Sequence, residues 1–511
     1  MSEASIREGN ARAGIQIGAT IALLIGFKLW LAASFPITGD EAYFISWGFK
    51  PDFGYYDHPP MVGWMIAALA QLSTAAWVLR MPVVLLPAVI GVGLFFALRR
   101  ADRQKALYAA LAFMLLPINV WNVFITTDTP LIFFSFFSGL AWWKARERDS
   151  AAWYLAAGVL LGLAFLSKYF SVLLAAVFFF DVAVAPRSRR PWRGLVLSYA
   201  AALPFILYNA WWNFENCWAN VMFNVYNRHD DAGLSIGSVA VYVVIVAYTL
   251  SPVALGQMAR RQWRDSLSGL PGVRFLLLAA GLPFAAFALV SIAHSIGLHW
   301  VLAFVPFFFM LAALTLNAKQ LKGSVVYLGL FSLLHVLAIA VAAALPIQTW
   351  KSSRLYDGIV FHFRIHDVVA EMLRYQSEFE LAADGYSPAT TAGYYAGRYV
   401  FVFGTASSHA RHDDLVTDFR ALKGKNILVF RKNRPEESEY QPYFRTVEVR
   451  SFALSGATFY LVLGRGFYYD AYRDRVLTAV RDRFYRIPSF LPQGGCVFCE
   501  RYFGSFCPVR G

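Results

Sequence analysis

About eleven apolar runs of near-spanning length recur between residues 14 and 346, and no other feature limits the possible folds of this chain so strongly. Several runs are shorter than the ~20 residues that an upright transmembrane helix needs. Only 15% of the residues are charged and 58% are hydrophobic, whereas soluble domains carry roughly 25% charged residues. The sequence therefore excludes a purely soluble enzyme and a disordered scaffold, and it predicts a polytopic α-helical membrane protein. The predicted spans are residues 14–35, 77–98, 105–119, 130–143, 151–167, 170–185, 194–213, 234–257, 274–294, 298–316 and 323–346.

The connections between these runs carry their positive charge in alternate loops. The loops of one side contain Arg99, Arg100, Arg103, Lys105, Lys144, Arg146, Arg148, Arg187, Arg189, Arg190, Arg193, Arg260, Arg261, Arg264, Arg274, Lys319 and Lys322. The loops of the other side and their edges contain Lys50, Arg80, Lys168 and Arg228. By the positive-inside rule, the arginine-rich side and the N-terminus are cytoplasmic. The same placement explains the formal net charge of +14 without a nucleic-acid partner.

Beyond residue 350 the long apolar runs stop and the sequence resembles that of a soluble segment. The pattern there predicts a short amphipathic helix over 367–375. Strands are predicted over 399–403, 426–431, 445–452 and 458–463. We therefore divide the chain into a transmembrane domain, residues 1–350, and a soluble α/β domain, residues 351–511. An odd number of spans places the second domain outside the cytoplasm.

Ionisable residues gather in the loops that are predicted to lie outside. They are Asp40, Glu41, Asp57, His58, Arg80, Asp128, Lys168, Arg228 and His299. Transfer of a sugar from a lipid phosphate needs such a set, because a carboxylate must take the proton of the acceptor hydroxyl. Cations must also hold the phosphate as it leaves. Asp40 and Glu41 are adjacent, so on a helix they diverge by about 100° and at most one points at a given substrate atom.

Each of these residues also has an ordinary structural explanation. Asp40, Glu41 and Asp128 are typical helix caps, and Asp57-His58-Pro59-Pro60 is typical of a turn before a helix. Lys168 fits an interfacial anchor, and His299 beside Trp300 fits an aromatic belt. Their common confinement to one predicted membrane face favours the functional interpretation.

Six strings in this order resemble the bacterial branch of the dolichyl-phosphate-mannose–protein mannosyltransferase family. They are GDEAYFISW, GYYDHPPMVGWM, VLRMPVVLLP, TTDTPLIFF, LSKYFSVLL and LYNAWWNFENCW. The branch includes lipid A aminoarabinose transferases and lipopolysaccharide-core galacturonosyltransferases. The resemblance covers roughly residues 14–315, and the tail also fits the family's soluble periplasmic domain.

This resemblance implies a membrane glycosyltransferase of the GT-C fold that uses a polyprenyl-phosphate sugar at the outer face of the membrane. By the family pattern Asp40 is the catalytic base, with Glu41 beside it and Asp128 as a competing candidate. The aminoarabinose transferases tend to carry an acidic-Lys-Pro string where this chain has Asp57-His58-Pro59, so an imidazole replaces a permanent charge. The residues predicted to bind the donor phosphate are Asp57, His58, Arg80, Lys168, Arg228 and His299.

The cysteines near the C-terminus could suggest zinc, but Cys496, Cys499 and Cys507 have no histidine close to them. Outside the cytoplasm a disulfide is the better expectation. The sequence predicts no cofactor; a divalent metal is compatible with it but is not indicated.

The sequence thus predicts an inverting glycosyltransferase of the bacterial inner membrane. Its predicted partners are a polyprenyl-phosphate sugar donor, a lipid or glycan acceptor and membrane lipids. The expected acceptor is lipid A or the lipopolysaccharide core, and the sugar is aminoarabinose, galacturonic acid or a hexose. A protein O-glycosyltransferase or another envelope-glycan transferase is the alternative within the enzyme class. A polytopic transporter is the alternative outside it, but the charges sit in outer loops rather than at the bilayer midplane of repeated halves.

Overall fold

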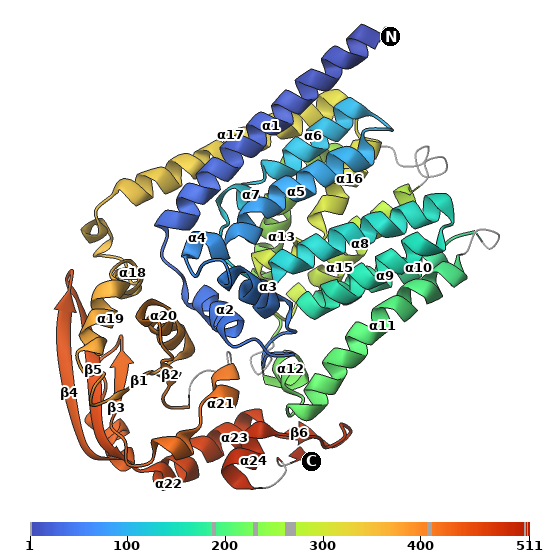
Figure 1. Cartoon of the computed structure of the whole chain (residues 1–511). Coiled ribbons are helices and arrows are strands. Elements are labelled where there is room, and N and C mark those ends of the chain that lie inside the picture. The colour runs from blue at the N-terminus through green and yellow to red at the C-terminus, as the bar shows by residue number, and fades with distance from the viewer. Residues whose placement is uncertain are drawn as a thin grey trace. The chain divides into compact units, whose positions relative to one another are not determined.

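Every predicted apolar run coincides with one helix, or with two consecutive helices, in the computed structural model (Figure 1). The structure describes residues 3–186, 191–227, 233–260, 272–405, 411–504, 507 and 509–510. The helices that match the runs are α1 (Glu3–Ser34), α4 (Ala76–Leu79), α5 (Met81–Leu98), α6 (Arg103–Met114), α7 (Pro117–Trp121), α8 (Asp128–Arg148), α9 (Ala151–Ser167), η1 (Tyr169–Ser171), α10 (Val172–Ala183), α11 (Trp192–Glu215), α13 (Ile236–Leu250), α14 (Pro252–Ala259), α15 (Val273–Ser291), η4 (Leu298–Val301), α16 (Val305–Thr315) and α17 (Ala318–Ala344).

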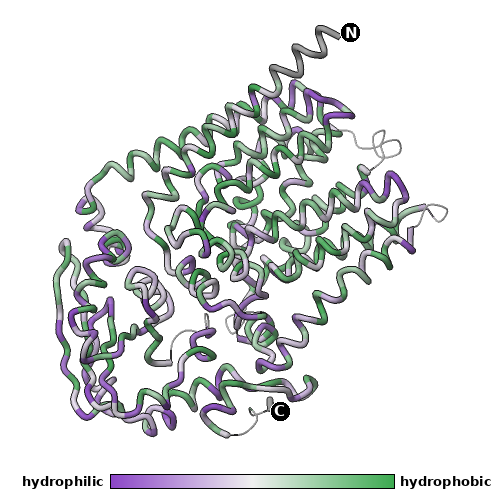
Figure 2. Tube along the Cα trace, viewed as in Figure 1, coloured by the Kyte–Doolittle hydropathy of each residue, from purple (hydrophilic) through white to green (hydrophobic). Residues whose placement is uncertain are grey.

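Within the described ranges, five helices are long and apolar enough to cross a membrane (Figure 2). They are Ala13–Ser34, Ala76–Leu98, Trp192–Glu215, Val273–Ser291 and Ala318–Ala344. Helices α13 and α14 make a sixth if the pair, bent by 93°, is one broken span. Pro252 stands at the bend, and it can begin α14 but cannot continue the hydrogen bonding of α13. The remaining apolar helices are shorter, so eleven crossings stay a prediction.

The chain separates into two compact units. The first contains residues 1–35, 75–207 and 231–343. The second joins residues 344–511 to two earlier segments, 36–74 and 208–230. Segments that the sequence assigned to the transmembrane domain therefore pack with the C-terminal part, and the boundary at residue 350 stays a prediction.

Aromatic side chains and one buried acid hold the helices of the first unit together. The Trp142 indole stacks on the Phe178 ring at 4.3 Å. The same indole donates to Asp181 at 3.1 Å. Arg146, in the last turn of α8, and Arg274, in the first turn of α15, pair with this carboxylate at 3.0 and 2.9 Å. The ion cluster thus ties the ends of three helices, at the end of α8 that the sequence places in the cytoplasm.

A five-stranded mixed sheet in the order β2-β1-β3-β5-β4 lies at the centre of the second unit. Strands β1, β2 and β3 are parallel to one another, and β5 is antiparallel to β3 and β4. The strands are β1 (Glu380–Ala383), β2 (Phe401–Val402), β3 (Ile427–Arg431), β4 (Phe444–Leu454) and β5 (Ala457–Phe467). Ser455 and Gly456 both have positive φ and close the β4–β5 hairpin, as a two-residue type I′ turn requires.

Helices cover both faces of this sheet. Leu428 and Phe430 of β3 pack with the apolar residues of α18, α19 and α20. Ile427 and Val429 alternate with them and pack with η9 and α23 on the other face. The remaining elements of the unit are α2 (Gly39–Phe49), α3 (Met61–Ala70), α12 (Ala219–Val221), η3 (Met222–Asn227), η5 (Ile347–Trp350), α18 (Tyr356–Phe363), α19 (Ile365–Leu373), α20 (Tyr386–Ala396), α21 (His412–Val416), η6 (Phe419–Leu422), η7 (Glu437–Glu439), η8 (Gln441–Tyr443), α22 (Tyr469–Tyr472), η9 (Arg473–Leu477), α23 (Thr478–Phe484), β6 (Ile487–Pro488), α24 (Val497–Phe503) and β7 (Val509–Arg510).

The four predicted strands of the tail coincide with β2, β3, β4 and β5, and the predicted helix coincides with α19. Strand β1 was not predicted, although it pairs with both β2 and β3. Its four residues, Glu380–Ala383, are too few and too rich in alanine to give a strand pattern.

Candidate active site

Helix α2 begins at the acidic pair of the first predicted outer loop. Thr38 is the N-cap, and its side chain accepts a hydrogen bond from the Glu41 backbone N–H. The Glu41 carboxylate accepts in return from the Thr38 backbone N–H at 3.1 Å and from its hydroxyl at 3.1 Å. This capping box buries Glu41. Asp40 points the other way and is exposed, so the two carboxylates diverge as predicted.

A tyrosine from the C-terminal part of the chain reaches Asp40. The Tyr386 hydroxyl donates to Asp40 Oδ1 at 2.8 Å. Burial and the Asp40 charge raise the pKa of Tyr386, so the phenol keeps its proton. Helix α20, which carries Tyr386, lies against α2 (Figure 1), and a Cβ on Gly39 would lie only 1.9 Å from Ser387 Oγ. Gly39 thus permits the close approach that brings Tyr386 to the carboxylate.

The segment before α3 folds into a tight turn that carries Asp57 and His58. The Tyr55 N–H donates to the His58 carbonyl at 3.1 Å, and the Tyr55 ring stacks on Trp47 at 4.2 Å. His58 is half-buried beside the Phe44, Trp47 and Phe223 rings. Asp57 is buried and hydrogen-bonds to Tyr43, whose pKa is raised by burial and by this carboxylate. The Asp57 and His58 side chains therefore extend from a turn that packed aromatic rings hold in place.

In the first unit, the structure brings three predicted residues together. Lys168 follows α9, and its ammonium lies 2.9 Å from both carboxylate oxygens of Asp128, the first residue of α8. Both side chains are buried, and the Lys168 ammonium also lies 4.9 Å from the Phe170 ring. His299 Nε2 lies 3.9 Å from Asp128 Oδ2, with half of its side chain exposed. Asp128, Lys168 and His299 thus form one charged cluster at a helix end.

Arg80 contacts other groups than this cluster. Arg80 is fully buried and donates to the carbonyls of Ala32 and Phe35 at 2.9 and 2.7 Å. These carbonyls lie at the C-terminal end of α1, where an arginine satisfies groups that the helix leaves without partners. This placement favours a structural role for Arg80 over phosphate binding. Arg228 lies outside the described residues.

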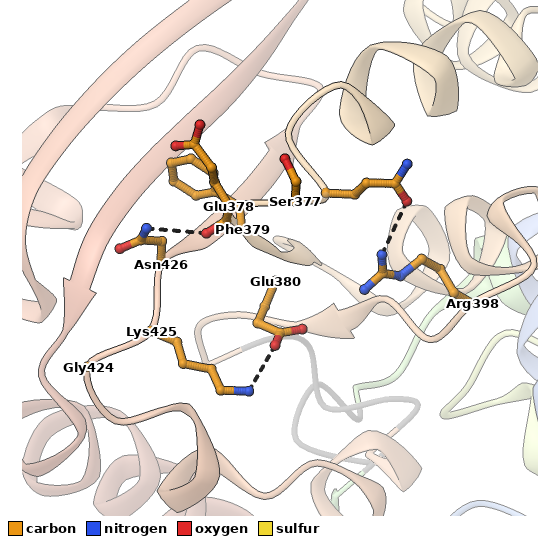
Figure 3. Close-up of a pocket in the computed structure, with 9 residues that line it drawn as sticks. Ser377, Glu378, Phe379, Glu380, Arg398, Gly424, Lys425 and Asn426 are labelled. Atoms are coloured by element: carbon orange, nitrogen blue, oxygen red, sulfur yellow. Dashed lines mark hydrogen bonds and ion pairs between the residues drawn. The ribbon is translucent and has the colours of Figure 1, made fainter.

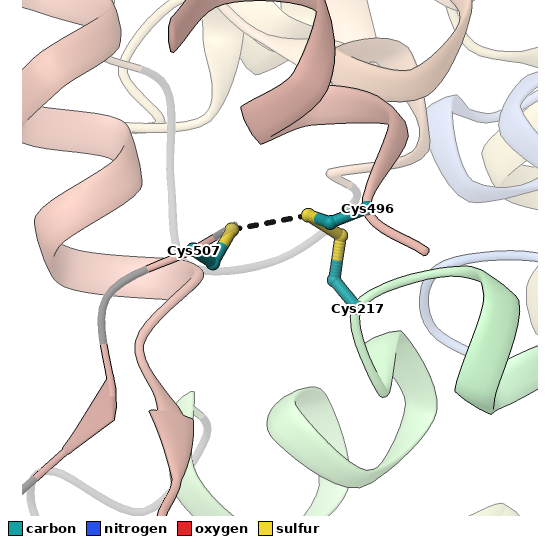
Figure 4. A group of neighbouring side chains, drawn as sticks. All are labelled: Cys217, Cys496 and Cys507. Carbon is teal, nitrogen blue, oxygen red and sulfur yellow. Dashed lines mark hydrogen bonds between the residues drawn. A yellow bond between two sulfur atoms is a disulfide. The ribbon is translucent and has the colours of Figure 1, made fainter. Parts of the chain in front are cut away.

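The four cysteines form two disulfides rather than the one expected. Cys499 pairs with Cys507 and Cys217 pairs with Cys496. Cys217, Cys496 and Cys507 are also the group of described metal-ligand side chains whose donor atoms lie within 4.8 Å of one another. Figure 4 shows the Sγ atoms of Cys496 and Cys507, which are 3.0 Å apart. Sulfurs engaged in disulfides offer no thiolate ligands to zinc.

A polar cavity of about 300 Å³ lies beside β1 and β3 of the second unit (Figure 3). Its charged side chains are paired with neighbours, as Lys425 with Glu380 at 2.9 Å and Arg398 with Gln376 at 3.5 Å. The cavity therefore presents balanced charge and no preference for a phosphate.

Sequence reasoning missed two groups of residues around these side chains. Tyr386 carried no signal in the sequence, because its contact with Asp40 joins positions 346 residues apart. A stripe of asparagines between residues 209 and 227 did leave a signal in the sequence, since its members recur every three or four residues and so share a helical face.

Comparison with known proteins finds a matching family model and two similar glycosyltransferases. The model of the dolichyl-phosphate-mannose-protein mannosyltransferases matches residues 57–212. The lipid A galacturonosyltransferase RgtD of Rhizobium johnstonii is 30% identical over 204 residues, which are 38% of this chain and 43% of that relative, so the match spans less than half of its length. The lipopolysaccharide core galacturonosyltransferase RgtA of the same organism is 25% identical over 356 residues, 65% of this chain and 69% of the relative.

A solved structure shares the fold. The crystal structure of ArnT from Cupriavidus metallidurans in the apo state has a TM-score of 0.60, with 16% identity, and covers 88% of this chain and 98% of that chain. The chain thus has an ArnT-like GT-C fold, and several of its described helices are long and apolar enough to cross a membrane. The matched segment and these relatives confirm the predicted resemblance to the dolichyl-phosphate-mannose–protein mannosyltransferase family.

Proposed function

We propose that this protein transfers a sugar from a polyprenyl-phosphate donor to lipid A or to the lipopolysaccharide core, with inversion at the anomeric carbon. The observation that carries the proposal is the exposed Asp40 carboxylate, oriented by Tyr386 at 2.8 Å. The relationship to galacturonosyltransferases of lipid A and of the core supports this class of acceptor. Galacturonic acid is the first sugar to test.

Asp40 acts as the general base in this proposal. Its second oxygen accepts the proton of the acceptor hydroxyl while the hydroxyl oxygen attacks the anomeric carbon. The bond between that carbon and the donor phosphate oxygen breaks, and the polyprenyl phosphate leaves with the electron pair. Glu41 is a poorer base, because two hydrogen bonds from Thr38 hold its carboxylate in the capping box. Asp128 is a poorer candidate too, because the Lys168 ammonium engages both of its carboxylate oxygens.

Lys168, His58 and His299 are the proposed ligands of the donor phosphate. Lysine is a common phosphate ligand, and Asp128 holds the Lys168 ammonium at 2.9 Å in the structure. His299 has half of its side chain exposed beside the same carboxylate, so a phosphate can approach this imidazole from solvent. Asp57 is assigned to the support of His58 rather than to direct phosphate contact, since like charges repel.

The proposal requires the second unit to lie outside the cytoplasm, and a fusion experiment tests this orientation. Alkaline phosphatase, which is active only after export, is expected to be active when fused after Gly511. The matched control is a fusion after Asp149, in the arginine-rich loop between α8 and α9, which is expected to be inactive. The disulfides support the same orientation, because they persist in oxidising compartments. Stable fusions with the opposite activities would reverse the orientation.

Mass spectrometry of envelope lipids tests the function itself. We expect lipid A or core oligosaccharide from a strain that lacks this protein to lose one sugar residue, and the wild-type chain to restore it. The Asp40→Asn chain, expressed at the same level, is expected not to restore it. Unchanged lipid A and core, with a sugar missing from a protein or another glycan, would move the function to the alternative acceptors.

A further inference from the structure

Six asparagines form a continuous stripe from the end of α11 to the end of η3. They are Asn209, Asn213, Asn216, Asn220, Asn224 and Asn227. The intervals of three and four residues place them on one helical face, although the helix is interrupted at Cys217 and Trp218, which have positive φ. Asn209, Asn213, Asn220 and Asn227 are buried. A buried amide needs partners for its donors and its acceptor, so such a stripe indicates a hydrogen-bond network.

This network contacts the backbone of the turn that carries Asp57 and His58. The Asn220 amide donates to the carbonyls of Tyr55 and Tyr56 at 2.5 and 3.0 Å. The Asn224 amide donates to the Asp57 carbonyl at 3.2 Å. Three successive carbonyls of the turn are therefore held by two asparagine side chains.

The asparagines are themselves fixed by their neighbours in the stripe. Asn213 Oδ1 accepts from the Asn220 backbone N–H at 3.0 Å, and the Asn213 amide donates to Asn220 Oδ1 at 3.3 Å. The Asn220 carboxamide thus has a defined orientation, with its oxygen toward Asn213 and its amide toward the turn. The Cys217–Cys496 disulfide and the bond from the Cys217 N–H to the Gly495 carbonyl at 2.9 Å hold the adjacent helix break.

Neutral amides suit this task better than charged side chains. They donate to backbone carbonyls without adding a charge beside Asp57, whose carboxylate is already buried. A turn whose carbonyls are held at three consecutive positions also keeps its side chains in one geometry before the ligand arrives.

We propose that Asn220 and Asn224 are positioning residues that hold the Tyr55–His58 turn so that His58 meets the donor phosphate. The inference rests on the proposed role of His58 in donor binding. Asn220 acts through the turn and does not touch the ligand. Asn220 and Asn224 are therefore expected to set donor affinity.

Binding of a polyprenyl monophosphate to the purified full-length chain tests this inference. Asn220→Ala is expected to weaken binding by about 10- to 100-fold, since an error of ~1 Å in position costs about that much. Asn224→Ala, which removes one contact to the turn, is expected to weaken binding less. Asn216→Ala is the matched control, because Asn216 follows α11 and its amide donates to the Trp212 carbonyl of that helix at 2.9 Å, away from the turn. It is expected to bind as wild type does.

A double-mutant cycle separates positioning from general damage to the fold. If Asn220 acts through His58, the His58→Ala/Asn220→Ala chain binds no more weakly than His58→Ala alone. Losses that multiply would overturn the inference, and so would wild-type affinity in both asparagine variants while His58→Ala binds weakly. Wild-type affinity in His58→Ala would instead refute the proposed role of His58 and this inference with it. The Asn224→Ala arm decides the question if Asn220→Ala does not fold.

Discussion

Asp40→Asn is expected to lower turnover by about 10²–10⁴-fold while leaving donor binding unchanged, because general-base assistance contributes about that factor. The asparagine keeps the size of the side chain and an oxygen that can accept from Tyr386. It cannot take the proton of an acceptor hydroxyl. Turnover of the purified protein with saturating donor, together with its thermal unfolding temperature, measures both effects.

Glu41→Gln is the matched control for this change. It alters the neighbouring carboxylate but keeps an oxygen that can accept from Thr38. We expect a loss of up to ~2 kcal/mol in the free energy of unfolding, the range for a helix cap, with turnover retained. Normal turnover in Asp40→Asn would disprove the assignment. A selective loss of turnover in Asp128→Asn would move the base to Asp128.

Lys168→Ala is expected to have two large effects. The first is a loss of about 3–5 kcal/mol in the free energy of unfolding, because Asp128 stays buried without the lysine that neutralises it. The second is weaker binding of a polyprenyl monophosphate by about 1.5–3 kcal/mol, the range for hydrogen bonds to charged groups. Thermal unfolding and equilibrium titration of the same preparation measure them separately.

A double variant separates these two effects. Lys168→Met combined with Asp128→Asn removes both charges, so most of the lost stability is expected to return. The weak phosphate binding is expected to remain, since the thioether of a methionine side chain has no hydrogen to donate to the phosphate. A double variant that binds the phosphate as tightly as wild type would show that Lys168 is only an ion-pair partner of Asp128.

The helical part of the fold could be predicted because each apolar run is local in sequence. All eleven runs coincide with helices, and the capping residues Thr38 and Glu41 are readable from their spacing. The packing of residues 36–74 and 208–230 with the C-terminal part could not be predicted. It depends on contacts between positions hundreds of residues apart, such as Asp40 with Tyr386, and these leave no periodic pattern.

The sequence supplied the residue types of the candidate site, whereas the contacts among them had to come from the structure, and their roles stay predictions. The Asp128–Lys168 pair joins two predicted residues, yet a list of charged positions does not reveal which of them meet. Arg80 looked like a phosphate ligand because it is basic and near an outer span end. The carbonyls of Ala32 and Phe35 that it contacts are backbone groups, which no side-chain pattern discloses.

The Cys217–Cys496 disulfide has a consequence for the biogenesis of the protein. Its partners are 279 residues apart in the sequence, so Cys217 must remain a free thiol while α13 to α23 are synthesised. None of the other three cysteines has been synthesised during that interval, and Cys496, Cys499 and Cys507 then follow within 12 residues of sequence. Correct pairing thus requires a choice among them, which a thiol-disulfide isomerase accelerates. A chain truncated before residue 496 would keep Cys217 unpaired and open to links with other proteins.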